Sequence, residues 1–281
     1  MKIGRFTVEQ LSEGQFEFFP DGTINRQPIN KEKEDLSKLI SKKSSELIGI
    51  NPVYITDGTF HILLDTGLGW GLDSGSAYKN VSNVVTNLEI FGVKPSDITH
   101  IVISHLHYDH SAGSSFTKSA QTVPTFPNAR YYIQQSEWDF ALKQVENGAK
   151  HSKSYTPDDL YRLYADSYFE MIDGKEEIIP GINLISTGGH TPGHQIVKVQ
   201  DGEDCAYFLG DLVPSEDYLN QHLRSNNDVD PLQTKKAKTL ILKQALKEKA
   251  FMLFYHSIYT EPGRLAQNEN KELILRGIKK N

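Results

Sequence analysis

The sequence predicts an α/β fold (α+β class), and three observations support this prediction. Short apolar runs rich in Val, Ile, Leu and Phe recur along the chain, as the strands of a buried sheet require. Asp-Gly pairs mark tight turns between two pairs of these runs. Two longer segments, residues 76–92 and the stretch from residue 230 onward, repeat their apolar residues at helical spacing.

The first 47 residues are harder to assign. We interpret the whole chain (1–281) as one domain, with residues 1–47 as an N-terminal extension that packs on it. The aromatic residues of this extension are expected to pack at the edge of the domain, and lining a substrate pocket is the alternative: Phe16, Phe18 and Phe19.

The next segment predicts a β-hairpin. Strand-like residues 51–56 and 60–64 flank Asp57-Gly58-Thr59, and an Asp-Gly pair tolerates the positive φ angles that a tight turn needs. The same reasoning predicts a second hairpin, which turns at residues 201–204. The two hairpins would allow a diverged duplication, although the sequence has no evident repeat.

Residues 76–92 predict an amphipathic helix that covers one sheet. Gly92 ends the pattern, since glycine favours the position after a helix. The apolar residues that recur at helical spacing are Val81, Val84, Val85, Leu88 and Phe91.

A dense polar motif follows the apolar run 98–103. Residues 105–110 contain three imidazoles and a carboxylate. His105 and His107 stand two apart, so on an extended strand both side chains leave on the same face and one metal can take both. Asp109 and His110 follow where the chain must turn, and can be aimed at a second metal. The alternative, a chance cluster of surface histidines, gives no reason for such dense spacing.

Three further candidate ligand positions also lie just beyond strand-like runs. Residues 182–187 lead to His190, residues 205–209 lead to Asp211, and residues 251–255 lead to His256, just as residues 98–103 lead to the motif described above. Four strand ends are therefore expected to converge on one rim. Residues 111–128, rich in Ser, Thr and Pro, predict a long loop that covers this rim.

A second helix is predicted to begin at Asp230-Pro231, where aspartate can cap the helix and proline fits its first turn. Its apolar side is expected to comprise Leu232, Ala237, Leu240, Ile241, Ala245 and Leu246. The lysines expected to face solvent are Lys235, Lys236, Lys238, Lys243, Lys247 and Lys249.

The motifs together resemble those of the metallo-β-lactamase superfamily. His105-Leu106-His107-Tyr108-Asp109-His110, Gly189–His194, Gly210-Asp211 and His256 occur in that family's order, and Leu64-Asp65-Thr66-Gly67 resembles its first motif. The resemblance spans roughly residues 48 to 260. It implies a four-layer αββα sandwich, with two mixed sheets packed together, helices outside, and metals at one edge between the sheets.

The resemblance also implies a role for seven residues. His105, His107 and His190 match the ligands of the first metal; Asp109, His110 and His256 match those of the second; Asp211 matches the bridging carboxylate. Such a set suits two zinc ions per chain, although manganese, iron or cobalt would also be accepted. His107 stands where the flavo-diiron branch has glutamate, which disfavours an oxygen-reducing diiron centre.

The expected function is that of a dinuclear, zinc-dependent hydrolase. Two ions about 4 Å apart would share a hydroxide, since metal coordination lowers the pKa of water from about 15.7 towards about 7. This metal-bound hydroxide would attack a small ester, lactone or thioester, and Asp109 or Asp211 would receive or shuttle the proton. Phosphoesters are a second substrate class. The alternatives are a mononuclear iron dioxygenase for thiols or persulfides, with one iron in place of two zinc ions, and a non-catalytic metal-binding protein.

Tyr108 and residues 190–195 are similar to the acyl-homoserine lactone lactonases. Those enzymes carry a tyrosine three residues after the bridging aspartate, where this chain has Pro214. The candidates to replace that tyrosine are Tyr218, His222 and Tyr259. The superfamily's β-lactamases lack the bridging aspartate, so Asp211 argues against antibiotic hydrolysis, and the glyoxalase recognition domain has little room after the last ligand.

Composition limits the partners and the location. A net charge of −6 offers no basic patch for nucleic acid, and no run approaches the roughly 18 apolar residues of a membrane span. The N-terminus lacks a signal-type apolar core, and the single Cys205, expected to be a small buried hydrophobe, permits no internal disulfide. We therefore expect a cytoplasmic protein with a small-molecule substrate and no separate organic cofactor; the sequence does not predict its oligomeric state.

The remaining histidines have different interpretations. His61 and His100 lie in or beside apolar strands and are expected to be structural, and His151 is expected to be solvated. His194 follows His190 after Thr-Pro-Gly, and this proximity permits a hydrogen bond that would orient the ligand. Whether that bond forms is left open by the sequence.

Overall fold

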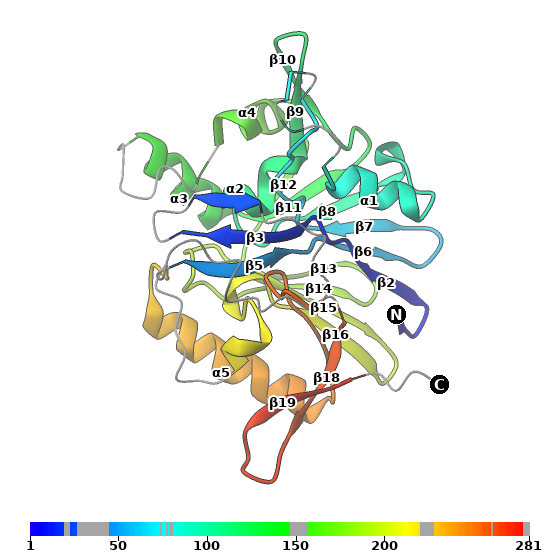
Figure 1. Cartoon of the computed structure of the whole chain (residues 1–281), viewed down its shortest axis with the longest axis vertical. Coiled ribbons are helices and arrows are strands. Elements are labelled where there is room, and N and C mark those ends of the chain that lie inside the picture. The colour runs from blue at the N-terminus through cyan, green and yellow to red at the C-terminus, as the bar shows by residue number, and fades with distance from the viewer. Residues whose placement is uncertain are drawn as a thin grey trace.

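The computed structural model describes residues 1–19, 23–26, 45–73, 75–76, 78, 81–146, 155, 157–219, 228–259 and 261–277. Within these ranges the strands form two seven-stranded sheets, a three-stranded sheet and a two-stranded hairpin. The two large sheets pack against each other and carry helices on their outer faces (Figure 1). The predicted four-layer αββα arrangement is confirmed.

The first large sheet is mixed. Its strands, in spatial order, are β1 (Lys2–Ile3), β2 (Phe6–Gln10), β6 (Val53–Thr56), β7 (His61–Leu64), β8 (His100–Val102), β11 (Arg130–Gln134) and β12 (Phe169–Ile172). Strands β6 and β7 form the predicted hairpin, with Gly58 in its turn at φ 92°. Strands β7, β8, β11 and β12 are parallel, so their carboxyl ends share one edge.

The second large sheet is mostly antiparallel. Its strands, in spatial order, are β13 (Lys175–Ile179), β14 (Ile182–Ser186), β15 (Gln195–Asp201), β16 (Asp204–Phe208), β17 (Phe251–Leu253), β18 (Gly263–Gln267) and β19 (Leu273–Gly277). Strands β15 and β16 form the second predicted hairpin. Strands β14, β16 and β17 point the same way, so their carboxyl ends also share one edge.

Strand alternation assigns each side chain to one of three cores. Ile62 and Leu64 face the core between the sheets, whereas Leu63 faces outward to α1 (Val84–Ile90), α3 (Gln135–Glu146) and α4 (Pro157–Ala165). In the second sheet Phe208 faces inward, and Tyr207 packs on the side of α5 (Pro231–Lys247). Figure 1 shows α1, α3 and α4 on one side of the strands and α5 on the other.

Two predicted segments differ from the structure. The helix predicted for residues 76–92 is shorter, because Asn83 caps α1: its side chain accepts a hydrogen bond from the Thr86 N–H. The prediction of a long loop at residues 111–128 was wrong. After α2 (Tyr108–Ser111) and a 3₁₀ turn, this segment forms the hairpin of β9 (Ser115–Lys118) and β10 (Gln121–Pro124).

Helix α5 follows the predicted cap, Asp230, and its predicted apolar side is confirmed in part. Ala237 and Ala245 are buried, and Ile241 and Leu246 pack against the same core. Leu232 and Leu240 are 74% and 60% exposed, whereas Lys238, predicted to face solvent, is only 4% exposed. The buried positions are Thr234, Ala237, Lys238, Leu242 and Ala245. The lysine is tolerated there because its stem of four methylene groups packs like an apolar side chain.

The N-terminal segment contributes to two sheets. Strands β1 and β2 extend the first large sheet, and β3 (Gly14–Phe18) lies between β4 (Ile24–Arg26) and β5 (Glu46–Ile50) in the small sheet. Phe16 and Phe19 are buried, as edge packing predicts. The one-domain assignment stays a prediction. No helix in the described ranges is long and apolar enough to cross a membrane.

Candidate metal centre

Four strand ends from the two sheets converge at one edge, as the sequence predicted. The residues beyond β8, β14, β16 and β17 contribute seven side chains, which form two groups of potential metal donors. Within each group, one ligand atom per residue lies within 4.8 Å of all the others. The first donor group is His105, His107, His190 and Asp211; the second donor group is Asp109, His110 and His256.

The local chain conformation explains how one short motif serves both groups. The chain stays extended to His107, whose φ of −62° and ψ of 144° lead directly into helix α2. Asp109 and His110 lie in the single turn of this helix and so point back to the other group. Tyr255 secures the turn, because its hydroxyl donates a hydrogen bond of 2.5 Å to the carbonyl of Asp109.

The nitrogen atoms of the first donor group face one another. Nδ1 of His107 lies 2.8 Å from Nε2 of His105 and 3.2 Å from Nε2 of His190. Oδ2 of Asp211 completes the group, 3.2 Å from Nε2 of His190. Three imidazoles and a carboxylate directed at a common point are a donor set that zinc accepts.

Asp211 also faces the second donor group. Its Oδ1 atom lies 3.3 Å from Nε2 of His110 and 3.2 Å from Nε2 of His256. These two nitrogens are 3.2 Å apart, and Oδ2 of Asp109 is 3.6 Å from Nε2 of His256. Oδ1 of Asp211 is buried, and it has no hydrogen-bond partner of suitable geometry among the described residues. A bridged pair of cations fits this arrangement, because it would satisfy that oxygen.

Outer hydrogen bonds orient three of the imidazoles. Nδ1 of His110 donates to Asp65 at 2.7 Å, and Nδ1 of His256 donates to the carbonyl of Gly49 at 2.9 Å. Nδ1 of His190 lies 3.0 Å from Oδ1 of Asp228. Each contact occupies Nδ1 and leaves Nε2 directed into the donor group, which is the arrangement that metal-binding histidines use.

The electrostatics of the two groups differ. Burial, together with the neighbouring imidazoles, holds the pKa values of His105 and His107 well below the ordinary value, which favours the neutral form that binds metal. Burial opposes the charge on Asp211, but the imidazoles of His256, His110 and His190 outweigh it and hold the pKa of this carboxyl well below its usual range. The first donor group therefore presents neutral nitrogens of His105 and His107 beside an anionic Asp211. In the second donor group burial opposes a charge on His110 and His256, but the nearby carboxylates outweigh it and raise the pKa values of both rings, so this group favours positive charge next to its carboxylates.

Asp228 is the site residue that the sequence analysis missed. Its carboxylate is buried against His190, and the backbone N–H groups of Val229 and Asp230 donate to the carbonyls of His190 and Gly189. The only nearby feature that the sequence predicts is Asp230, two residues after Asp228, which caps the start of α5. Nothing in the spacing indicates that this segment meets a histidine 38 positions earlier.

His194 orients a different partner from the one predicted. Its Nε2 accepts a hydrogen bond of 3.0 Å from the backbone N–H of Asp211, and Nδ1 lies 2.7 Å from the Thr187 hydroxyl. Burial and the neighbouring charge of His190 lower the pKa of His194 to about 3, so the ring is neutral and can accept this bond. His194 thus supports the bridging aspartate through its backbone.

Other candidate residues make contacts outside the two donor groups. The Tyr218 hydroxyl donates to Glu46 at 3.2 Å, and Tyr259 is 63% exposed. Cys205 is buried and burial raises its pKa to about 11, as expected of a structural thiol. His61 and His100 bond to neighbouring hydroxyls, of Tyr54 and Thr99, as structural residues do. His151 and His222 lie outside the described residues.

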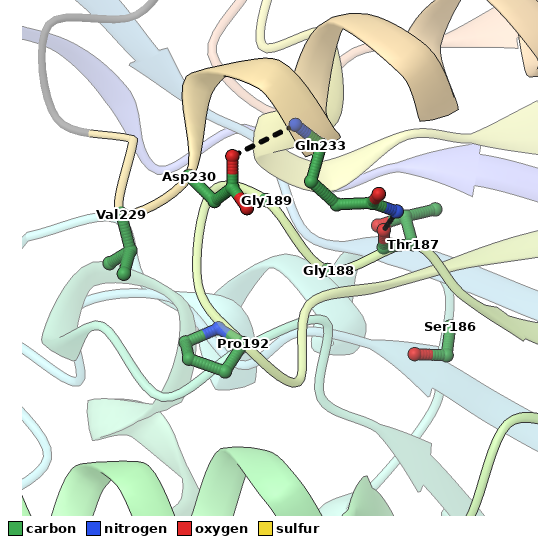
Figure 2. A pocket seen from close by; sticks show the side chains of 8 residues that line it. All are labelled: Ser186, Thr187, Gly188, Gly189, Pro192, Val229, Asp230 and Gln233. Carbon is green, nitrogen blue, oxygen red and sulfur yellow. Dashed lines mark hydrogen bonds between the residues drawn. The ribbon is translucent and has the colours of Figure 1, made fainter.

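A cavity of about 670 Å³ lies behind the loop that carries His190. It is lined by residues 186–189 of that loop, by Pro192, and by Val229, Asp230 and Gln233 at the start of α5. Figure 2 shows the loop passing beneath α5, where the Gln233 amide donates to the carbonyl of Thr187 at 2.8 Å. The ligand loop is therefore held from the α5 side by hydrogen bonds.

Comparison with known proteins gives matches over most of the chain. A family model described as the metallo-beta-lactamase superfamily matches residues 46–256. An N-acyl homoserine lactonase from Bacillus sp is 27% identical over 183 residues, which are 64% of this chain and 64% of that protein. The chain thus matches somewhat less than two thirds of the length of such relatives.

Solved structures resemble the whole chain more completely. A protein from Staphylococcus aureus, described as a probable metal-dependent hydrolase, has a TM-score of 0.76 at 22% identity, over 98% of this chain and 99% of that one. A dizinc quorum-quenching lactonase in complex with a product has a TM-score of 0.75 at 21% identity, over 99% and 97% of the two chains. At these identities the likeness shows a shared fold.

Proposed function

The chain belongs to the metallo-β-lactamase superfamily, and from this premise we propose that it is a dinuclear, zinc-dependent hydrolase of a small ester, lactone or thioester. The observation that carries the proposal is the position of Asp211, whose two oxygens each face one donor group. A residue that only completed one mononuclear site would not need its second oxygen directed at two further imidazole nitrogens, those of His110 and His256.

The proposed ligands of the first ion are His105, His107 and His190, and those of the second are Asp109, His110 and His256. Asp211 is the proposed bridge. Zinc bound there would polarise a carbonyl and lower the pKa of water. Asp211 fixes the separation of the two groups, and Oδ2 of Asp109, on the rim of the second group, is placed to hold a proton.

A lactone is the favoured substrate within this class. The support is the resemblance to proteins named as N-acyl homoserine lactonases, which extends over 64% of the chain. Pro214 occupies the place of the tyrosine that holds the lactone carbonyl in that branch, so this chain must hold the carbonyl by another group. We also propose that the whole chain is one domain and that its partner is a small molecule. The proposed location is cytoplasmic, and the support for it is that Cys205 is the single cysteine of the sequence.

Metal content and substrate preference test the proposal together. Elemental analysis of the protein as purified is expected to give two zinc ions per chain. The zinc-loaded protein is then assayed by proton release in a pH-stat with lactones, simple esters, thioesters and phosphodiesters. Rapid release from the carboxylic substrates, with none from phosphodiesters, supports the proposal. One iron per chain, or release from phosphodiesters alone, contradicts it.

A further inference from the structure

One buried carboxylate close to the centre has no part in the donor groups. Glu137 lies in the first turn of α3, which continues directly from β11, and its side chain is fully buried. A buried carboxylate is costly unless it accepts several hydrogen bonds. The hydrogen-bond donors around Glu137 therefore indicate the role of this side chain.

Glu137 joins the two loops that carry the first donor group. Its Oε1 accepts the backbone N–H of Leu106, the residue between His105 and His107, at 2.9 Å. Its Oε2 accepts the hydroxyl of Thr191 at 2.6 Å and the N–H of Gly193 at 3.2 Å. Thr191 directly follows the third histidine of the group, so each oxygen holds a different ligand loop.

The close packing at this point depends on glycine. A Cβ atom on Gly193 would lie 2.2 Å from the backbone nitrogen of Glu137, so a larger residue would push the loop away from α3. On its opposite side the same loop contacts α5, since a Cβ on Gly189 would lie 2.5 Å from the nitrogen of Thr234. The loop that carries His190 is therefore clamped between the first turns of two helices.

All three groups that bond to Glu137 are donors, so the carboxylate only accepts. A backbone hydrogen bond from Gln195 to the carbonyl of Ser104 also joins the two chain segments, but it lies next to β15, behind the ligands. Glu137 instead bonds to residues directly adjacent to the ligands, namely Leu106 and Thr191. We propose that Glu137 is a positioning residue that holds His105 and His107 in register with His190 for the first metal ion.

This inference rests on the proposed function, and its test isolates the first donor group. In a His256→Ala background the second group is incomplete, so zinc affinity, measured by competition with a chromophoric chelator, reports the first group. Adding Glu137→Gln keeps the size of the side chain but turns an N–H₂ group towards a donor. We expect this change to weaken zinc binding about 10- to 100-fold, as loss of partners of metal ligands does.

Glu13→Gln is the matched control. Glu13 is also a buried carboxylate that accepts backbone N–H groups. It accepts from Leu68 and Val84, and both of these residues lie outside the ligand loops of the first group. It should lower the unfolding temperature of the same background without changing its zinc affinity. If Glu13→Gln and Glu137→Gln weaken zinc binding equally, Glu137 is only structural and the inference is wrong.

Thr191 supplies a second, milder test should Glu137→Gln fail to fold. Thr191→Val removes the hydroxyl that Glu137 accepts and is expected to weaken zinc binding in the same background, whereas Thr191→Ser keeps the hydroxyl and should restore it. Equal zinc affinity in the two variants would overturn the inference. Absence of zinc binding by the unmodified chain would instead contradict the proposed function, so the two failures are distinguishable.

Discussion

The Nδ1 atom of His190 lies 3.0 Å from Oδ1 of Asp228, and both side chains are almost fully buried. The backbone reinforces this contact, because the next two N–H groups after Asp228 donate to the carbonyls of His190 and Gly189. The segment before α5 thus fixes the backbone and the imidazole of one proposed metal ligand together. The carboxylate also adds negative charge behind a ring that would coordinate a cation.

Asp228→Asn is expected to weaken zinc binding at the first donor group about 10- to 100-fold, because a neutral amide polarises the imidazole less than a carboxylate does. Chelator competition measures the change. Asp230→Asn is the control: it keeps a side-chain cap on α5, which Asp230 provides to Leu232 and Gln233, and does not contact His190. Equal affinities in the two variants would mean that Asp228 does not tune the ligand.

The sequence predicted those features of the structure that depend on residues adjacent in the chain. The Asp57-Gly58 turn and the Asp230-Pro231 helix start depend on the conformational preferences of adjacent residues, and both are present. The motif from His105 to His110 could be recognised because its donors are neighbours in the chain. Its convergence with His190, Asp211 and His256 followed from the position of each beyond an apolar strand.

Features that depend on distant contacts were not predictable in this way. The turn between β9 and β10 contains Ser119 and Ala120 at φ 51° and 62°. Neither residue type indicates a positive φ, so the sequence alone predicts a loop where the structure has a hairpin. Lys238 is buried because neighbouring elements cover that face of α5, not because of its own spacing. Asp228 and Glu137 meet the ligand loops only after the chain has folded.

Asp109→Asn is expected to affect the second donor group selectively. The amide keeps the shape of the side chain, but it binds a cation more weakly and cannot hold a proton as the carboxylate does. We expect zinc content to fall from two ions per chain towards one, and the hydrolytic rate to fall at least 100-fold. Elemental analysis after dialysis measures the first change and a pH-stat the second. Full activity with two zinc ions would show that Asp109 has neither role.

Gly189→Ala is expected to destabilise the protein through contact with α5. The position has φ 91°, and the added Cβ would lie 2.5 Å from the nitrogen of Thr234. Gly58→Ala is a matched control, since Gly58 has φ 92° but nothing within 4 Å of the added atom. Both variants lose about 1–2 kcal/mol from backbone strain, and Gly189→Ala should lose about 1–3 kcal/mol more from the steric conflict. Urea unfolding measures the difference in the free energy of unfolding. Similar decreases in the two variants would show that the loop moves away from α5 without further loss of stability.

The buried lysine of α5 predicts a specific dependence of stability on pH. Burial lowers the pKa of Lys238 from 10.5 to about 8, against the opposing charge of Asp228. Between pH 8 and 10.5 the unfolded chain therefore binds more protons at this residue than the folded chain does, and stability rises with pH across that window. Below pH 8 the full cost of burying the charge is present.

Lys238→Met removes this cost while keeping most of the apolar stem. At pH 7 the free energy of unfolding should rise by on the order of 1 kcal/mol, and the gain should shrink as the pH is raised from 8 to 10.5, where the native lysine loses its proton in the folded state. Urea unfolding at several pH values measures both effects. Lys236→Met, at an exposed position of the same helix, should show neither. A Lys238→Met variant less stable than the parent at pH 7 would mean that the ammonium group makes a net favourable contact in the folded protein. A gain that persists undiminished at pH 10.5 would mean that it comes from the apolar packing of methionine and not from removal of the buried charge.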